Sequence, residues 1–93
     1  MHHRNPRDGI RDKWMPRVCA AEIDGETRAL MLVLYQYMTE RGRVSVPQAV
    51  LADLFQVDPR RIKERMRRAR DAGLIVQRGV AYQGRTAEYE AVT

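Results

Sequence analysis

The chain has 93 residues, 44% of them apolar and 31% charged, and its formal net charge is +5. Domains usually hold roughly 100 to 200 residues, so we expect one small domain and no second, catalytic one. A chain of this size buries only about 60 to 65% of its unfolded surface, which leaves a thin core and little room for a deep substrate pocket.

Cys19 is the single cysteine of the chain, so neither an internal disulfide nor a Cys-x-x-Cys metal site can form. The longest apolar run covers the seven residues 29–35, whereas about 20 are needed to cross a bilayer. No apolar stretch follows the basic N-terminus, which argues against a secretory signal. We therefore expect a cytoplasmic protein with no membrane association, no metal and no cofactor.

Basic residues are concentrated in one segment. Residues 59–70 hold seven basic side chains and one acidic one, Glu64, which gives +6, whereas the other 81 residues sum to −1. Residues 1–17 carry a smaller surplus of +3. Codon bias explains why 15 of the 17 basic residues are arginine, but it does not explain the clustering. Positive charge gathered on one element and one tail indicates a polyanionic partner.

The N-terminal residues 1–16 contain Pro6, Gly9 and Pro16 and show no sustained hydrophobic period, which predicts an arm. We therefore divide the chain into a basic, partly ordered arm over residues 1–22 and a folded domain over residues 23–93. Within the arm, Trp14 is the side chain expected to dock on the domain.

Residues 27–41 form the first predicted helix, and Gly42 suits a left-handed position after its end. Its core face consists of side chains at helical spacing: Leu30, Val33, Leu34 and Tyr37. A second apolar strip lies beside them: Met31, Tyr35 and Met38. The second strip requires a cover, either Trp14 and Val18 from the arm or a second copy of the chain in a homodimer.

A short strand over residues 44–46 and a short helix over residues 47–55 come next. Asp58 and Pro59 then restart a helix over residues 59–72, because aspartate accepts from free first-turn amides and proline presets the helical φ. The core face of this third helix is narrow and consists of Ile62, Met66 and Ala69.

After Gly73 the hydrophobic period becomes two, which predicts strands over residues 74–78 and 87–92. Gly79 and the pair Gly84-Arg85 mark the turn of the hairpin. In the second strand we expect an apolar face and an opposite acidic face formed by Glu88 and Glu90.

The segment LADLFQVDPRRIKERM, residues 51–66, followed by ARDAGLI, residues 69–75, resembles the helix-turn-helix of winged-helix transcription regulators. The resemblance implies a mainly α fold with a small β-hairpin, a winged helix-turn-helix with a three-helix core plus a wing. Two positions depart from the family pattern. Gln56 stands where the family has a turn glycine, and Asp58 stands where it usually has serine.

The same resemblance implies binding of double-stranded DNA, with the helix over residues 59–72 in the major groove and a wing over residues 74–92 along the backbone or minor groove. A transcriptional regulator of a phage or plasmid is the expected role. An excisionase, an architectural factor or a replication accessory factor is the first alternative. A winged helix that contacts an acidic protein is the second.

The candidate DNA contacts follow from the face opposite the core of the third helix. Base readers are expected near its start: Arg60, Arg61 and Glu64. Phosphate contacts are expected from Lys63, Arg67 and Arg68. The wing contributes Arg78 and Arg85, and the arm contributes Arg4, Arg7 and Arg11. For Glu64 a helix salt bridge with Arg60 or Arg68 is the competing explanation.

Enzyme signals are absent from the sequence. It holds no Ser, His and Asp set, no glycine-rich phosphate loop and no pair of histidines at ligand spacing in the predicted domain. We therefore expect no enzymatic activity, and the sequence gives no sign of a small-molecule ligand.

Overall fold

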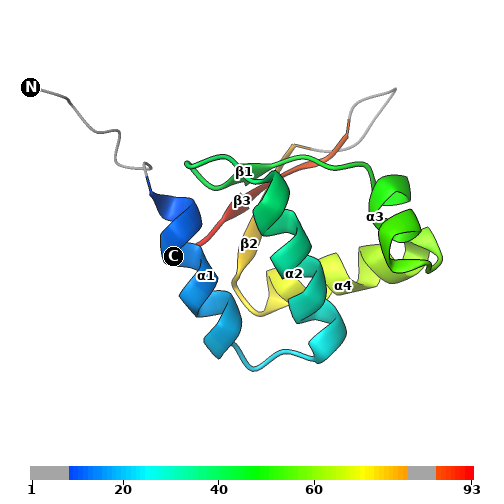
Figure 1. Cartoon of the computed structure of the whole chain (residues 1–93), viewed down its shortest axis with the longest axis horizontal. Helices are drawn as coiled ribbons and strands as arrows, with labels where there is room; N and C mark the ends of the chain where they lie inside the picture. Colours follow the sequence, from blue (N-terminus) through cyan, green and yellow to red (C-terminus); the bar gives the residue numbers. More distant parts are fainter. Residues whose placement is uncertain (1–8, 80–85) are drawn as a thin grey trace, which may run out of the picture.

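The computed structural model describes residues 9–79 and 86–93, so the predicted contacts of Arg4, Arg7 and Arg85 lie outside the described residues. The elements follow one another as α1 (Ile10–Ala20), α2 (Gly25–Tyr37), β1 (Arg43–Val44), α3 (Gln48–Phe55), α4 (Pro59–Asp71), β2 (Ile75–Gly79) and β3 (Glu88–Ala91). The coarse prediction of a mainly helical chain with a small β part is confirmed (Figure 1).

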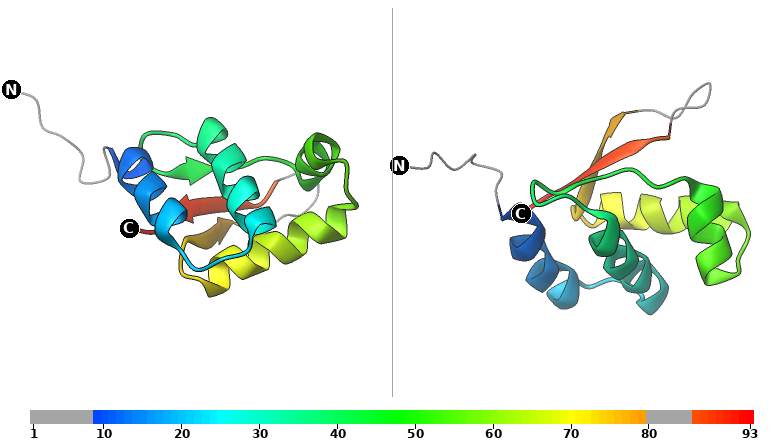
Figure 2. Two further views of the ribbon diagram at one scale, coloured as in Figure 1. Left: turned by 60° about the horizontal axis from the view of Figure 1, so that its bottom comes forward. Right: turned by 45° about the horizontal axis from the view of Figure 1, so that its top comes forward.

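The strands form one antiparallel sheet in the order β1-β3-β2. Val44 pairs with Tyr89, and Ile75 pairs with Ala91. Figure 2 shows β2 and β3 side by side next to the helices, with β3 in the middle of the sheet. The prediction of an exposed acidic face on β3 holds for one of its two glutamates. Glu88 is exposed, but Glu90 is buried and pairs with Arg78 of β2 at 2.7 Å.

Residues 10–20 of the expected, partly ordered arm form helix α1, which the sequence analysis did not predict. Ile10, Trp14 and Val18 are all buried at four-residue spacing, which makes one apolar face of a helix. Gly9 and the prolines made this apolar spacing difficult to recognise in the sequence. Gly9 precedes the helix, and Pro16 lies inside it on the exposed side.

Helix α1 lies against α2 and supplies the cover that the second apolar strip required. The Tyr35 hydroxyl donates to Asp12 at 2.9 Å, and Arg11 donates through Nε to the Tyr35 carbonyl at 3.2 Å. Met31 and Met38 are buried inside the single chain. The strip is therefore accounted for without a second copy of the chain.

Helix α2 ends at Tyr37, four residues before the predicted end at residue 41. Met38 is already extended, with a ψ of 140°, and its N–H donates to the Tyr35 carbonyl. Gly42 has the predicted positive φ, +83°, but it lies in the turn that leads into β1. Tyr37, the last residue of α2, was expected in the core but is 51% exposed.

The turn between α3 and α4 depends on Gln56, which has a left-handed conformation with a φ of 53° and a ψ of 48°. This conformation brings the Val57 N–H to the Ala52 carbonyl at 3.0 Å and closes the end of α3. A side chain with a Cβ is strained there by about 1–2 kcal/mol. Gln56 therefore adopts the glycine conformation at a cost.

We predict that Gln56→Gly raises the free energy of unfolding by about 0.5–1 kcal/mol, because relief of the strain exceeds the extra backbone entropy that glycine loses on folding. Urea denaturation followed by circular dichroism measures the change. Gln36→Gly is the matched control, since Gln36 lies in helical conformation on α2 and should lose up to about 1 kcal/mol. Equal losses at both positions would show that Gln56 is not strained.

Candidate nucleic-acid interface

Helix α4 begins as the sequence predicts. The Asp58 carboxylate accepts from the Arg60 N–H at 2.8 Å, and Pro59 occupies the first turn. The same N–H, together with the Arg60 guanidinium, lowers the pKa of Asp58 below its ordinary value of 3.8. The charged cap fixes where α4 starts and therefore which residues lie on each of its faces.

The core face of α4 contains the predicted Ile62, Met66 and Ala69, all buried, and one residue that the sequence analysis missed. Arg65 has a side chain only 7% exposed, and its guanidinium lies 3.5 Å from the Glu26 carboxylate. The same guanidinium stands 5.3 Å from the centre of the Phe55 ring. Arg65 is therefore a packing residue between helices and is removed from any contact surface.

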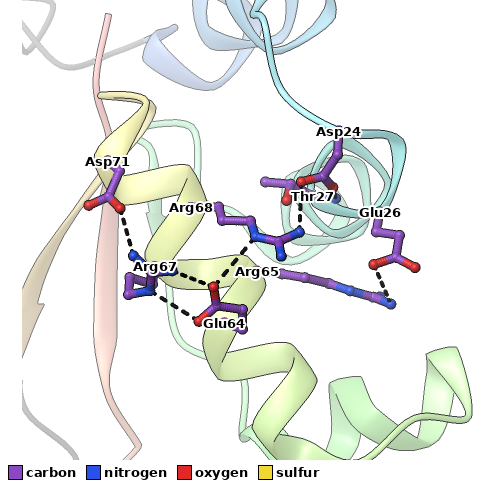
Figure 3. Close-up of polar contacts among 8 residues, drawn as sticks. All are labelled: Asp24, Glu26, Thr27, Glu64, Arg65, Arg67, Arg68 and Asp71. Atoms are coloured by element: carbon purple, nitrogen blue, oxygen red, sulfur yellow. Dashed lines mark hydrogen bonds and ion pairs between the residues drawn. The ribbon is translucent and has the colours of Figure 1, made fainter.

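One side of α4 faces α2, and we call Arg61, Arg65 and Arg68 the α2 flank. Figure 3 shows Arg65 and Arg68 directed toward the start of α2, where Asp24 and Glu26 lie. Arg68 reaches Asp24 at 2.9 Å, and Arg61 lines a hollow together with Glu26 and Arg65. Asp24 also caps α2 by accepting from the Thr27 N–H, which lowers the pKa of Asp24, as does Arg68.

Glu64 is occupied within the helix. One of its carboxylate oxygens accepts from Arg67 and lies 3.5 Å from Arg68, and the other accepts from Arg67 at 3.0 Å. Arg67 is the main cause of its lowered pKa. The expected salt bridge is present to Arg68, whereas Arg60 pairs with Asp58 at 3.2 Å. These contacts favour the salt-bridge explanation over acceptance from a cytosine.

The other side of α4 faces the hairpin, and we call Arg60, Lys63, Arg67 and Arg70 the hairpin flank. Lys63 borders a hollow together with Thr86 and Ala87 just before β3, and Arg70 donates to the Gln77 side chain of β2 at 2.8 Å. Arg60 and Arg67 lie three residues before and four after Lys63, so they share its side of the helix. The Arg60 side chain is 90% exposed.

The structure thus splits the predicted contact residues between two flanks. Arg60, Lys63 and Arg67 lie beside the hairpin, and Arg70, which the sequence analysis did not select, joins them. Arg61 and Arg68 lie beside α2, with Glu64 bound between the helix's own arginines. Arg70 lies seven residues after Lys63, which is close to two full turns of an α-helix, so this spacing could have identified it.

Acidic side chains compensate part of the positive charge on α4. Acidic residues from three parts of the chain pair with it: Asp24, Glu26, Asp58, Glu64 and Asp71. On the hairpin flank, Lys63 and Arg70 have no ion pair within residues 9–79 and 86–93. On the α2 flank, Arg61 has no ion pair in the same residues, so two uncompensated cations lie on the side that faces the hairpin and one on the side that faces α2.

Two further predicted contacts are held by the protein itself. The Arg78 guanidinium is engaged by Glu90 across the hairpin, although its side chain is 54% exposed. Arg11 lies 4.3 Å from the centre of the Tyr35 ring, so it helps to dock α1 on α2. Both arginines have a structural role in the folded domain.

No family model matches the chain, and no curated protein matches it either. Among the residues that the structure describes, no helix has the length and apolar character needed to span a membrane. In the same part of the chain, no cluster of three or more His, Cys, Asp or Glu side chains is placed to hold a metal ion.

Proposed function

We propose that this protein binds double-stranded DNA, with α4 in the major groove and the β2–β3 hairpin as the wing. The observation that carries the proposal is the hairpin flank of α4. Lys63 and Arg70 lie there without acidic partners among the described residues, on the helix that a tight turn separates from α3. A helix with cations on an open face and an adjoining β-hairpin is the arrangement that winged helix-turn-helix proteins place on a duplex.

Phosphates can recruit further cations from the existing ion pairs. On the hairpin flank, the side chains of Arg60 and Arg67 are 90% and 54% exposed, so their pairs lie in a high-dielectric environment. Exposed pairs contribute only about 0–1 kcal/mol each. These side chains therefore lose little free energy when they exchange a carboxylate for a DNA phosphate, in contrast to buried Arg65.

Transcriptional regulation is the role that we infer for this binding. Arg60 is the best-placed base reader, because it is close to the start of α4 and is highly exposed, and arginine suits the O6 and N7 atoms of guanine. Lys63 and Arg70 are then phosphate contacts that set the position of the helix.

Titration of the full chain into a fluorescent random duplex over a range of salt concentrations tests the proposal. We expect the logarithm of the binding constant to fall linearly with the logarithm of salt, with a slope of roughly 0.9 for each phosphate neutralised. Absence of duplex binding at low salt would contradict the proposal. Strong bending of a permuted duplex set would reassign the role from regulator to architectural factor.

A further inference from the structure

A hollow of about 310 Å³ lies between α4, the start of α3 and the strands β1 and β3. Its floor is apolar and consists of side chains that are almost fully buried: Leu34, Leu51 and Met66. The hollow is open to the surface and lies at the edge of the core.

The dimensions and lining suit a small organic molecule. Ligand sites usually measure about 300–1,000 Å³ and combine apolar walls with a few polar groups. Gln48 and Thr86 provide polar groups here, and Lys63 provides a cation. Lys63 has no ion pair within the described part of the chain, so its ammonium group is available to a carboxylate.

We propose that this hollow binds a small apolar carboxylate, with the apolar body against Leu34, Leu51 and Met66 and the carboxylate on Lys63. A DNA phosphate could also reach Lys63, but it has no apolar part to occupy the floor beneath. The hollow and the charge together therefore favour an aromatic or branched aliphatic acid over a phosphate diester.

Occupancy of the hollow would regulate DNA binding, and this part of the inference rests on the proposed function. Lys63 belongs to the hairpin flank, so a carboxylate that pairs with it removes a phosphate contact. The hollow also touches Ala87 and Tyr89 at β3, so its occupant sits against the hairpin. A bound acid should therefore weaken duplex binding.

The test uses 2-naphthoate and its neutral amide, 2-naphthamide, titrated into the full chain without DNA. Calorimetry measures affinity, and methyl NMR spectra locate the site. We expect 2-naphthoate to bind about tenfold more tightly than the amide, because an ionised partner strengthens the contact. Signals of Leu34, Leu51 and Met66 should shift. Absence of binding, or shifts elsewhere, would overturn the proposal.

Two variants separate the charge from the cavity. Lys63→Met should reduce the affinity for 2-naphthoate to that for the amide, whereas Lys13→Met, at the exposed lysine of α1, should leave it unchanged. Ala87→Leu fills the hollow and should abolish binding of both probes, with circular dichroism as the check on folding. Equal loss in both lysine variants, or none in either, would refute the role of Lys63.

A final pair of titrations distinguishes this inference from the proposed function. Binding of 2-naphthoate by a protein that ignores duplex DNA would reject only the DNA proposal. Duplex binding without 2-naphthoate binding would reject only the ligand site. If both bind, saturating 2-naphthoate should weaken duplex affinity several-fold, and an unchanged affinity would contradict the regulatory coupling.

Discussion

Trp14→Ala is expected to lower the free energy of unfolding by about 3–5 kcal/mol, as loss of a large buried aromatic side chain usually does. Trp14 is completely buried, and its Nε1 donates to the Leu74 carbonyl at 2.7 Å. The substitution therefore creates a cavity and removes the bond that ties α1 to the segment before β2. Small domains are stable by only about 5–15 kcal/mol, so much of the stability should be lost.

Urea denaturation followed by circular dichroism measures this effect, since the variant contains no tryptophan. Cys19→Ala, at an exposed position of the same helix, should change stability by no more than about 0.5 kcal/mol. Trp14→Phe should fall between the two, because it keeps an aromatic ring and loses the N–H donor. A Trp14→Ala variant as stable as the control would show that α1 is peripheral to the fold.

Helix α4 and the turn before it could be predicted from the sequence because several local signals agree there. Asp58 caps the helix, Pro59 fits its first turn, and the apolar spacing of Ile62, Met66 and Ala69 gives one unambiguous face. These signals depend only on near neighbours in the chain, so they could be seen without the fold.

Helix α1 was missed because breaker residues outweighed a short apolar period. Trp14 and Val18 supply the stabilising contacts of α1, and those contacts are with distant segments such as the one at Leu74. Tertiary packing of this kind overrides local helix propensity, so the helix is difficult to predict from the neighbouring residues alone.

The candidate site was predicted only in part for the same reason. The cluster of cations on α4 was evident, but its division into two flanks depends on Asp24, Glu26 and Gln77, which come from α2 and β2. The hollow beside Lys63 was not foreseen, because its walls come from segments far apart in the sequence, such as those at Leu34 and Tyr89. Neither the two flanks of α4 nor the hollow corresponds to a pattern among residues that are close together in the sequence.

The second large effect concerns the two flanks of α4, which can be compared at equal charge. Lys63→Gln with Arg70→Gln removes two cations from the hairpin flank, and Arg61→Gln with Arg68→Gln removes two from the α2 flank. We expect the first pair to weaken duplex binding about a hundredfold at 0.1 M salt, roughly tenfold for each lost phosphate contact. The second pair should have an effect below about fivefold, through the long-range field alone.

The physical reason is the difference in pairing and in position. Arg68 is bound to Asp24 and Glu64, and Arg61, which has no ion pair in the described residues, lies beside Glu26 on the side of α4 that faces α2. Lys63 and Arg70 have no ion pair in residues 9–79 and 86–93 and lie on the side that faces the hairpin. Loss of Lys63 or Arg70 therefore removes a cation that is available to a phosphate. Loss of Arg68 removes a cation that carboxylates of the protein already hold.

The salt dependence of duplex binding by these two double variants, measured beside the original chain, tests the account most directly. A lost phosphate contact reduces the slope, so the hairpin-flank variant should have a log–log slope smaller by roughly 2, and the α2-flank variant should keep the original slope. Equal slopes for both variants, or a larger loss in the α2-flank variant, would contradict the placement of DNA between α4 and the hairpin.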